Sequence, residues 1–406
     1  MNPKLMQLFE ILSYMKHNIE HLNHRLQLMK VLSKVAIFVV FILIVLILCP
    51  TITAYDSRAV QYYNDGVDFT NLGQHLQAIA SYDKAIAINP DFAEAWFNRG
   101  LELDNLGRYT EAVDSYDKVL AINPKNANAA TNRGYTLNEL GQYSDALISS
   151  DKAIAINPND AMAWSNRGFA LDHLGRYSEA VASYDKAIAI NQNYYEVWNN
   201  RGIALFHLKQ YSDALISSDK AIAINPNDAN AWNNRGLTLD NLGRYTEAVA
   251  SFDKALAINP NYSYAWYNCG FTLNKLGRYT DAVASYDKAL AINQNDADTW
   301  YNRGITLDNL GRYTEAVASF DKTLAINPKD AEAKQNREIA LGKQSQMQQT
   351  SDSQVQISTT PVQTDITPIK TQQQAKSTPL LYAHIGAIVL VAGIAVWSRR
   401  FGFPKQ

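Results

Sequence analysis

The stretch "WFNRGLELDNLGRY", from Trp96 to Tyr109, places an asparagine, an arginine and two acidic residues around two glycines. Such a polar cluster is found both at active sites and in structural modules. The first of its glycines returns every 34 residues, at Gly66, Gly100, Gly134, Gly168, Gly202, Gly236, Gly270 and Gly304. Repetition at this period indicates a structural unit that is stacked many times, so the cluster is better interpreted as part of a module than as a catalytic site.

Several other positions repeat with the same period. They are Ala78, Ala112, Ala146, Ala180, Ala214, Ala248, Ala282 and Ala316, then Pro90, Pro124, Pro158, Pro226, Pro260 and Pro328, and Trp96, Trp164, Trp198, Trp232, Trp266 and Trp300. In the second unit we expect one helix over Ala93 to Leu106, a break at "GRY" and a second helix from Thr110. Gly100 and Ala112 are small because the two helices must approach closely, and Pro124 follows the end of the second helix.

A 34-residue period with Trp, Gly, Ala, an aromatic residue and Pro in this order resembles the tetratricopeptide repeat. The resemblance covers Ala59 to Asp330, which is eight units. It implies an all-α fold, a right-handed α-solenoid of helix-turn-helix repeats in which each pair buries its apolar stripe against its neighbours. Residues 331–343 keep part of the pattern but carry Lys334 and Glu338 where Trp and Gly are expected, which predicts a polar capping helix.

The resemblance also implies a concave groove lined by the first helix of each unit. One asparagine per unit lies two residues before the repeated glycine, at Asn64, Asn98, Asn132, Asn166, Asn200, Asn234, Asn268 and Asn302. This asparagine ladder resembles the one that holds extended peptides in the protein O-linked N-acetylglucosamine transferases. An amide side chain can donate to a peptide carbonyl and accept from a peptide amide, so the ladder from Asn98 to Asn302 is a candidate peptide-binding site. The alternative is a structural role inside the repeats.

Further candidate binding residues lie beside the ladder. Tyr135 and Phe169 belong to an apolar row, and Asp104, Asp172 and Asp240 belong to a row of acidic or amide residues. A groove with these two rows should prefer extended polypeptide that carries apolar and basic side chains. The cationic residues of the family's two-carboxylate clamp for chaperone tails are missing here, which argues against a chaperone co-factor of that type.

Departures from the family pattern suggest two packing features. An arginine precedes the repeated glycine in six units, and we expect each guanidinium to meet a carboxylate of the second helix, for example Asp117 or Asp253. Ser150 and Ser218 replace the usual aromatic residue of the second helix. The third and fifth units should therefore pack less tightly than the others.

Nothing in the sequence predicts an enzyme, a cofactor site or a metal site. Neighbouring repeats place the acidic residues too far apart for paired acid and base catalysis. "HNIEH", His17 to His21, matches a zinc-protease pattern, but one helix ahead of an apolar span offers no cleft. Basic residues gather at the two ends of the chain and the stretch between them is acidic, which argues against nucleic acid as a partner.

Two apolar segments flank the repeats. Val35 to Ala54 spans 20 residues without a charge, and Leu380 to Trp397 spans 18 residues without Asp, Glu, Lys or Arg. Because about 20 apolar residues cross a bilayer as a helix, we expect a transmembrane helix over 35–54 and another over 380–397. Basic residues precede the first span and occupy the tail, 398–406, so both termini are expected in the cytoplasm and the repeats outside it. The alternatives are a signal peptide that begins at Met29 and a topology with cytoplasmic repeats.

The remaining segments have simpler compositions. Residues 1–34 contain a four-heptad apolar seam from Leu5 to Met29, which predicts a coiled coil and hence a possible homodimer, or an amphipathic helix on the membrane surface. Residues 344–378 are rich in Gln, Ser, Thr and Pro and are expected to form a flexible stalk. The "NRG" and "LGRY" motifs resemble arrays of methanogenic archaea and cyanobacteria. Together these features predict a membrane-anchored scaffold of archaeal or bacterial type that binds protein or peptide partners. The alternatives are a cytoplasmic-facing assembly platform for a membrane complex and an enzyme-associated subunit that is itself non-catalytic.

Overall fold

Helices in pairs make up the part of the chain that can be described. The computed structural model describes residues 57–358, with side chains as far as residue 350, and isolated positions before residue 40. Within 57–358 the helices are α3 (Ser57–Asn71), α4 (His75–Ile88), α5 (Ala93–Asn105), α6 (Tyr109–Ile122), α7 (Ala127–Glu139), α8 (Tyr143–Ile156), α9 (Ala161–His173), α10 (Tyr177–Ile190), α11 (Tyr195–His207), α12 (Tyr211–Ile224), α13 (Ala229–Asn241), α14 (Tyr245–Ile258), α15 (Ser263–Lys275), α16 (Tyr279–Ile292), α17 (Ala297–Asn309), α18 (Tyr313–Ile326) and α19 (Ala331–Ser358).

Each pair, from α3–α4 (repeat 1) to α17–α18 (repeat 8), is closed by the same short turn. In repeat 2 the turn glycine, Gly107, has a φ of +70°, and the amide of Arg108 donates to the carbonyl of Leu103. A left-handed residue with this hydrogen bond is a common way to end a helix, and glycine adopts it without strain. Repeat 5 carries Lys209 at the equivalent position, with a φ of 60°. The turn chemistry therefore repeats even where the glycine is absent.

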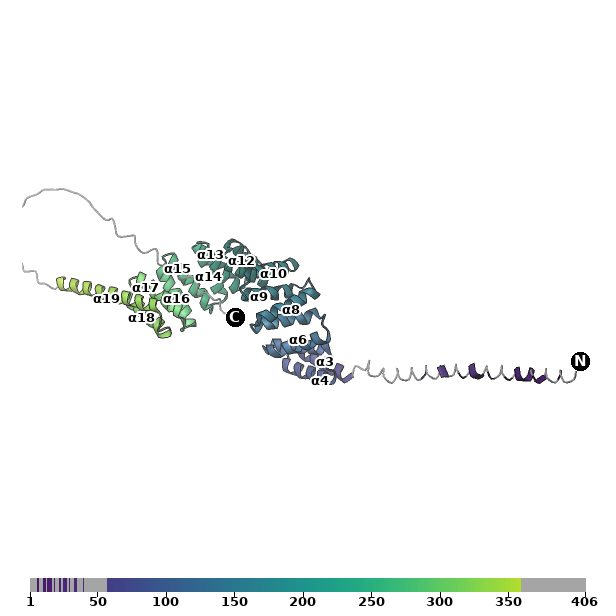
Figure 1. The fold of residues 1–406 in the computed structure, drawn as a ribbon. Helices are drawn as coiled ribbons and strands as arrows, with labels where there is room; N and C mark the ends of the chain where they lie inside the picture. The colour runs from purple at the N-terminus through teal and green to yellow at the C-terminus, as the bar shows by residue number, and fades with distance from the viewer. Residues whose placement is uncertain are drawn as a thin grey trace, which may run out of the picture. The chain divides into compact units, whose positions relative to one another are not determined.

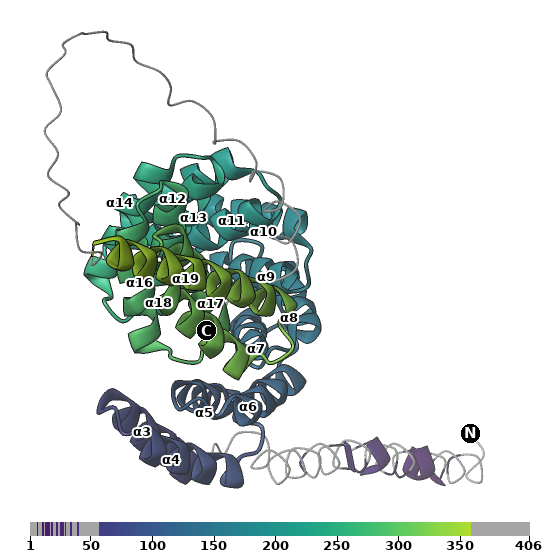
Figure 2. The same ribbon diagram turned by 90° about the vertical axis from the view of Figure 1, so that its left-hand side faces the viewer.

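The helices form two layers. Each odd-numbered helix from α5 to α15 contacts the next odd-numbered helix, for example α7 with α9 and α11 with α13, as well as its even-numbered partner. Each even-numbered helix up to α16 packs against the odd-numbered helices on either side of it (Figures 1 and 2). Because elements lie closer together on the inside of a curve, the odd-numbered helices form the inner layer of the array. The predicted binding residues belong to these helices, so the surface of the inner layer is the candidate binding surface.

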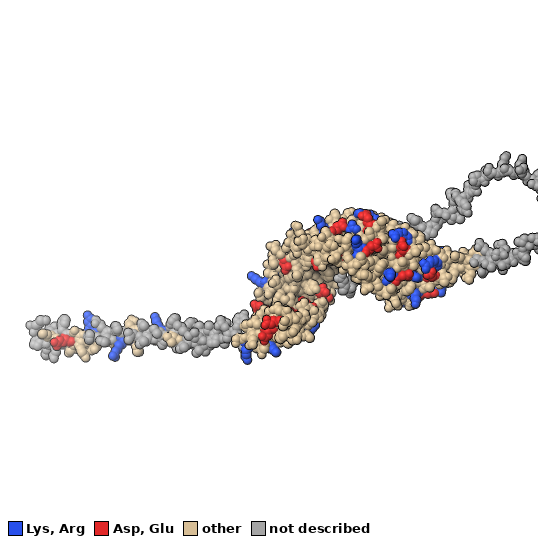
Figure 3. All heavy atoms as spheres, turned by 180° about the vertical axis from the view of Figure 1, so that it is seen from behind, with Lys and Arg blue, Asp and Glu red and all other residues tan. Residues whose placement is uncertain are grey.

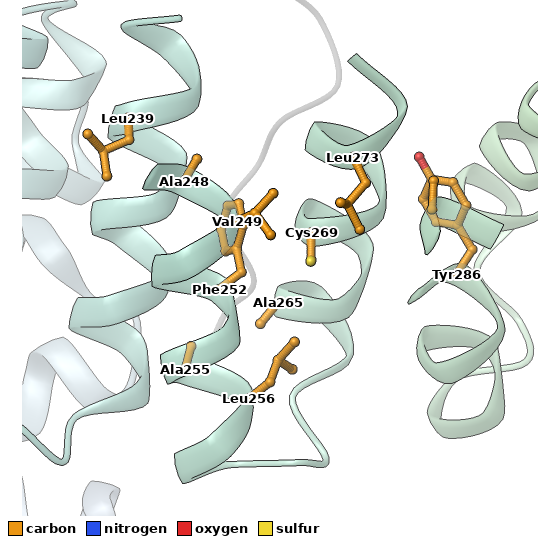
Figure 4. Packing of buried hydrophobic residues seen from close by; sticks show 11 residues of the cluster. Leu239, Ala248, Val249, Phe252, Ala255, Leu256, Ala265, Cys269, Leu273 and Tyr286 are labelled. Carbon is orange, nitrogen blue, oxygen red and sulfur yellow. The ribbon is translucent and has the colours of Figure 1, made fainter. Parts of the chain in front are cut away.

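The core runs continuously from one repeat to the next. In repeats 6 and 7, Phe252 of α14 packs with Leu239 of α13, Cys269 of α15 and Tyr286 of α16, all of them buried. Figure 4 shows these side chains between neighbouring helices of the two repeats. A repeat buries its aromatic ring only when the next pair is in place, which is why such arrays gain stability by stacking.

The repeated glycine of each first helix is explained by its contact with the second helix of the same repeat. A Cβ added at Gly168 would lie 2.5 Å from Cε1 of Tyr184, and at Gly100 it would lie 2.6 Å from Cε1 of Tyr116. The buried aromatic ring of each second helix therefore needs the glycine of the first helix. In repeat 5 the ring is replaced by buried Ser218, and the nearest atom to an added Cβ at Gly202 is its Oγ, at 3.3 Å.

Several sequence predictions differ from the structure or fall outside it. The second helix of repeat 2 begins at Tyr109, one residue before the predicted start. The capping helix expected over 331–343 continues as α19 to Ser358, and so includes part of the predicted stalk. In the described part of the chain, no helix combines the length and apolar character needed to cross a bilayer. The predicted spans, 35–54 and 380–397, and the tail lie outside the described residues, and the N-terminal seam is described at isolated positions only.

Candidate functional site

The asparagine ladder lies in the inner layer, and its amide nitrogens are used mostly between repeats. Their Nδ2 atoms reach back 35 residues to the preceding first helix in five of the predicted positions, including Asn166, which donates to the Thr131 backbone carbonyl at 3.0 Å. The other four bond to side chains. The bonds are Asn98 to the Tyr63 hydroxyl (3.2 Å), Asn234 to Asn199 Oδ1 (2.9 Å), Asn268 to Asn233 Oδ1 (3.1 Å) and Asn302 to the Tyr267 hydroxyl (3.2 Å). The ladder therefore ties neighbouring repeats together, which the sequence did not predict.

Two members, Asn132 and Asn200, depart from this arrangement, and Asn166 follows it from a buried position. Asn132 donates to the Asn128 carbonyl of its own helix. Asn166 is buried. Its side-chain amide donates to the Thr131 backbone carbonyl, and its own backbone carbonyl accepts from the side-chain amide of Asn138. Asn200 is half-buried and has no hydrogen-bond partner among the described residues. The seven predicted asparagines thus differ in what they leave open to a ligand.

A cavity of about 180 Å³ opens beside the first predicted ladder residue. It is lined by Asn98 together with Tyr63 and Phe97 of the inner layer, and by Asn126 and Asn128 at the start of α7. The lining thus combines aromatic rings with amide side chains, and it also includes Glu94. Such a surface suits a peptide backbone that carries an apolar side chain.

Tyr135 and Phe169, the predicted apolar residues, are both reachable from solvent. Tyr135 is 42% exposed and Phe169 is half-buried. Phe169 lies 4.2 Å, between ring centroids, from His173, which in turn stacks on Tyr143 at 4.5 Å. Repeats 3 and 4 therefore present an aromatic patch made of Tyr143 at the start of α8, Phe169 of α9 and the His173 imidazole.

Of the three predicted aspartates, two have partners inside the protein. Asp104 accepts from the Tyr116 hydroxyl at 2.7 Å and from Thr136 Oγ1 at 2.9 Å. Asp240 is buried and accepts from Thr272 Oγ1 at 2.9 Å and from Lys275 Nζ at 2.5 Å. These two carboxylates join neighbouring repeats and do not form an open acidic margin.

Asp172 of α9 is different. Its Oδ1 atom is buried and has no hydrogen-bond partner among the described residues. Burial raises the pKa of its carboxyl group to about 7. A carboxylate without a partner in a partly buried position is costly to keep charged, so a cation brought by a ligand would be bound favourably there.

The arginines before the repeated glycines form a second network, separate from the ladder. Arg133 Nε lies 2.7 Å from Asp117 Oδ1, so Asp117 meets a guanidinium as predicted, and Arg133 Nη1 donates to Ser149 Oγ. The same pairing is made by Arg99 with Asp83, Arg167 with Asp151, Arg201 with Asp185, Arg235 with Asp219 and Arg303 with Asp287. Each aspartate belongs to the second helix of the preceding repeat, so the bridge crosses between repeats.

The prediction for Asp253 is wrong. The residue at the arginine position of the following repeat is Cys269, so Asp253 has no guanidinium to meet there. Burial raises the pKa of Asp253, and Arg278 nearby lowers it in part. Ser150 and Ser218, expected to loosen repeats 3 and 5, are both buried, and the helices of each pair remain in contact.

Two sets of surface residues were not identified from the sequence. Lys275 and Lys343 each pair with an aspartate 35 residues earlier, a spacing that a search for charge pairs between repeats would have found. Ile148 and Ile216 are 66% and 55% exposed on the even-numbered helices α8 and α12. Figure 3 shows basic and acidic side chains interspersed on one face of the molecule, without a patch of one sign.

Comparison with known proteins supports the architecture. Models described as tetratricopeptide repeat match residues 93–126, 161–194, 229–262 and 297–330, and 115–148, 183–216 and 251–284. A model described as TPR repeat matches 66–102 and 272–311. A model of the protein prenyltransferase alpha subunit repeat matches 143–174 and 211–242, which hold Ser150 and Ser218. Among curated proteins, no sequence matches the chain.

Solved structures are similar to part of this chain. The APC/C hetero-tetramer Cut9–Hcn1 is 19% identical, with a TM-score of 0.51 over 66% of this chain and 52% of that one. This chain therefore matches about half the length of that relative. The type IV pilus biogenesis factor PilW is 23% identical, with a TM-score of 0.48 over 52% and 97% of the two chains. PilF of Pseudomonas aeruginosa is 21% identical, with a TM-score of 0.47 over 52% and 95%.

The repeat models together cover residues 66–148, 161–216 and 229–330, more than half of the chain. Over the same residues the structure shows paired helices, the glycine and aromatic contact and the closing turn. The chain belongs to the tetratricopeptide-repeat family.

Proposed function

We propose that the protein is a scaffold that binds an extended polypeptide along the inner layer formed by the odd-numbered helices. The observation that carries this proposal is the asparagine ladder, in which six of the seven amide nitrogens are engaged while several side-chain oxygens accept no bond from the described residues. The Oδ1 atoms of Asn98, Asn268 and Asn302 accept no hydrogen bond within the described part of the chain. A side-chain amide oxygen of this kind can accept from a peptide N–H. Asparagines at the same position of successive repeats can therefore bind a peptide backbone whatever its sequence.

The surroundings of the ladder favour a polypeptide over a small molecule. Tyr135 and Phe169 provide apolar contact area at the middle of the array, and the cavity beside Asn98 provides it near the start. Because the amide nitrogens already hold neighbouring repeats, the ladder is rigid before a ligand binds. A preorganised row loses little side-chain entropy on binding. The fold is typically a non-catalytic scaffold, and we infer no reaction for it.

Selection from a phage-displayed library of random 12-residue peptides tests this proposal with the full-length protein. Asn200 is the best residue to change, since it has no described partner and its loss should leave the fold unaffected. Asn200→Ala should weaken the selected peptides by about 2-fold to 10-fold, the value of one hydrogen bond. Phe169→Ala should weaken them further through lost apolar contact. Ile148→Ala, on an even-numbered helix, is the control and should bind as the parent does.

Two results would refute peptide binding along the inner layer. Either no peptide is selected, or the selected peptides bind all three variants as tightly as the parent. Loss of binding by Ile148→Ala alone would place the ligand on the even-numbered helices instead.

We further propose that the scaffold is anchored in a prokaryotic cell membrane by helices at 35–54 and 380–397, with the repeats outside the cytoplasm. The support is the sequence: two long charge-free segments with basic residues on their outer sides. A secreted form that begins at Met29 and a platform with cytoplasmic repeats are the rival arrangements.

Protease treatment of intact cells that produce the protein with a tag at each end distinguishes the three arrangements. Cleavage between the tags with both tags protected is expected for the proposed topology. Complete protection would place the repeats in the cytoplasm, and absence of the N-terminal tag from the mature protein would identify a signal peptide.

A further inference from the structure

Two repeat interfaces hold a lysine ammonium group in the same way. Lys275 Nζ lies 2.5 Å from Asp240 Oδ2, and 5.4 Å and 4.6 Å from the ring centroids of Tyr245 and Phe271. Lys343 Nζ lies 2.5 Å from Asp308 Oδ2 and 5.6 Å from the ring centroid of Tyr313. In both cases the lysine follows the aspartate by 35 residues and the tyrosine begins the second helix of the aspartate's repeat. A carboxylate and a tyrosine face therefore form an ammonium site in this fold.

Repeat 4 contains the same aspartate and tyrosine without the lysine. Asp172 and Tyr177 are the equivalents, and the residue 35 positions after Asp172 is His207. The His207 imidazole stacks on the Tyr177 ring, with centroids 4.5 Å apart and an interplanar angle of 10°. No described hydrogen bond or ion pair joins it to Asp172, whose Oδ1 atom has no partner among the described residues.

The other internal donors to this position are also missing at Asp172. Asp104 and Asp240 each accept from a threonine 32 residues later, whereas Asp172 is followed at that distance by Ala204. Tyr116 donates to Asp104, but its equivalent, Tyr184, makes no described hydrogen bond to Asp172. Asp308 likewise has no described partner at Oδ1 and is followed 32 residues later by Ala340, but its Oδ2 pairs with Lys343. The donor that Asp172 lacks in comparison with Asp308 is therefore the lysine.

Solvent reaches this position in the interfaces where it is filled. The Lys275 and Lys343 side chains are 31% and 41% exposed. Asp172 itself is half-buried and lies three residues after Phe169, whose ring is part of the aromatic patch of repeats 3 and 4. A lysine side chain that arrives from outside can therefore lay its methylene groups along aromatic rings and direct its ammonium group to the carboxylate.

We propose that Asp172 is the subsite for a lysine side chain of the bound polypeptide, whose ammonium group binds the carboxylate as Lys275 and Lys343 do in their own interfaces, while the Tyr177 face stays covered by His207. The inference rests on the proposed peptide-binding function and adds a specificity to it. A peptide with lysine at this point gains a charge-assisted hydrogen bond, and a peptide with an uncharged residue leaves the carboxylate unsatisfied. The subsite therefore sets the register of an otherwise sequence-tolerant groove.

The chain itself offers a test of the site that needs no ligand. His207→Lys restores the lysine found in the two filled interfaces, and His207→Met is the matched control that also removes the imidazole. His207→Lys should melt on the order of 2 °C above His207→Met, since one charge-assisted hydrogen bond is regained. The difference should vanish when both changes are made in an Asp172→Asn background. Equal melting temperatures of the two single variants would show that Asp172 cannot receive an ammonium group, and would overturn the proposal.

The second test uses the peptides selected on the parent protein. Lysine should be enriched at one position, and replacing it by norleucine should weaken binding by roughly 10-fold to 100-fold. Asp172→Asn should cost the same factor, the two losses should not add, and His207→Lys should block the lysine-dependent part.

The outcomes separate the two proposals. Selected peptides that lack a lysine preference, or that bind Asp172→Asn as they bind the parent, overturn the subsite while the groove function stands if Asn200→Ala still weakens them. Failure to select any peptide refutes the groove and the subsite together. A lysine preference that Asp172→Asn abolishes, with Asn200→Ala also weaker than the parent, supports both.

Discussion

Alanine substitutions at Gly168 and Gly202 test the packing of the repeat most sharply, because the two glycines occupy equivalent positions in α9 and α11. At Gly168 the added methyl group would lie 2.5 Å from Cε1 and 2.7 Å from Cδ1 of Tyr184, which is 1% exposed. At Gly202 it would lie 3.3 Å from Ser218 Oγ and 3.4 Å from the Ala214 carbonyl oxygen. Carbon atoms pack at about 3.5 to 4.0 Å, so Gly168 has no room and Gly202 nearly enough.

Two opposing effects set the size of the change. Replacing glycine by alanine inside a helix stabilises by about 1 kcal/mol. Overpacking a closed core costs about 1 to 3 kcal/mol, and at Gly168 the ring cannot move without shifting a helix. Gly168→Ala should therefore lower the free energy of unfolding, whereas Gly202→Ala should leave it unchanged or raise it by up to about 1 kcal/mol. The two variants should differ by about 2 kcal/mol.

Urea unfolding of the full chain, followed by circular dichroism, measures the difference. Amide hydrogen exchange in α9 and α10 locates it, because a repeat array can open one pair at a time. Tyr184→Ser reproduces the serine of repeats 3 and 5, so Gly168→Ala should lose its penalty in that background. Equal effects of the two alanine substitutions, or an undiminished penalty beside Tyr184→Ser, would refute the glycine and ring contact as the reason for the repeated glycine.

Four further results are expected. Arg167→Ala should destabilise by about 1 to 2 kcal/mol through loss of its bonds to Asp151 and Ser183, whereas Arg176→Ala, in an exposed pair with Glu179, should change stability by less than about 0.5 kcal/mol in the same urea assay. Ser150→Ala should stabilise by about 1 kcal/mol, because the buried hydroxyl has no described partner; a loss in thermal melting would reveal a partner. Lys209→Gly should stabilise by about 1 kcal/mol by relieving a left-handed lysine, and a lower urea midpoint would contradict this. Burial raises the pKa of folded Asp172 to about 7, so it keeps a proton that the unfolded chain releases, and the stability this contributes is lost as the pH rises from about 4 towards about 7. The parent should therefore lose stability over that range relative to Asp172→Asn, and parallel pH profiles in urea unfolding would contradict this.

The array itself was predictable because its signals are local and repeated. The glycine and alanine at fixed spacing, the turn before Tyr109 and the prolines between units all act within one helix pair, and the structure confirms the solenoid they indicate. The extent of α19 was missed because the segment beyond residue 343 lacks apolar periodicity, the property on which the sequence prediction relied. Intrinsic helix propensity without an apolar face leaves a weak signal.

The sequence predicted where the candidate site residues lie, but it did not predict their hydrogen bonds. Ladder residues and aspartates were placed on the inner layer by their register in the repeat. Which atoms they leave open depends on partners 32 to 35 residues away, such as Asn233 for Asn268 or Thr272 for Asp240. The same dependence explains the wrong prediction for Asp253, which failed because the partner position in the next repeat holds Cys269. In such an array the contacts that decide function lie between repeats, so each position must be considered together with the next unit.

Site-specific photocrosslinking tests the central claim most directly. A photoreactive phenylalanine analogue placed at Tyr135, on the inner layer, or at Ile148, on an even-numbered helix, samples the two faces of the same molecule in cells that produce it; both positions are exposed. A polypeptide crosslinked at position 135 and absent at position 148, with its yield reduced by Asn200→Ala, is the predicted result. Crosslinks from position 148 alone, or from position 135 without any effect of Asn200→Ala, would contradict binding along the asparagine ladder.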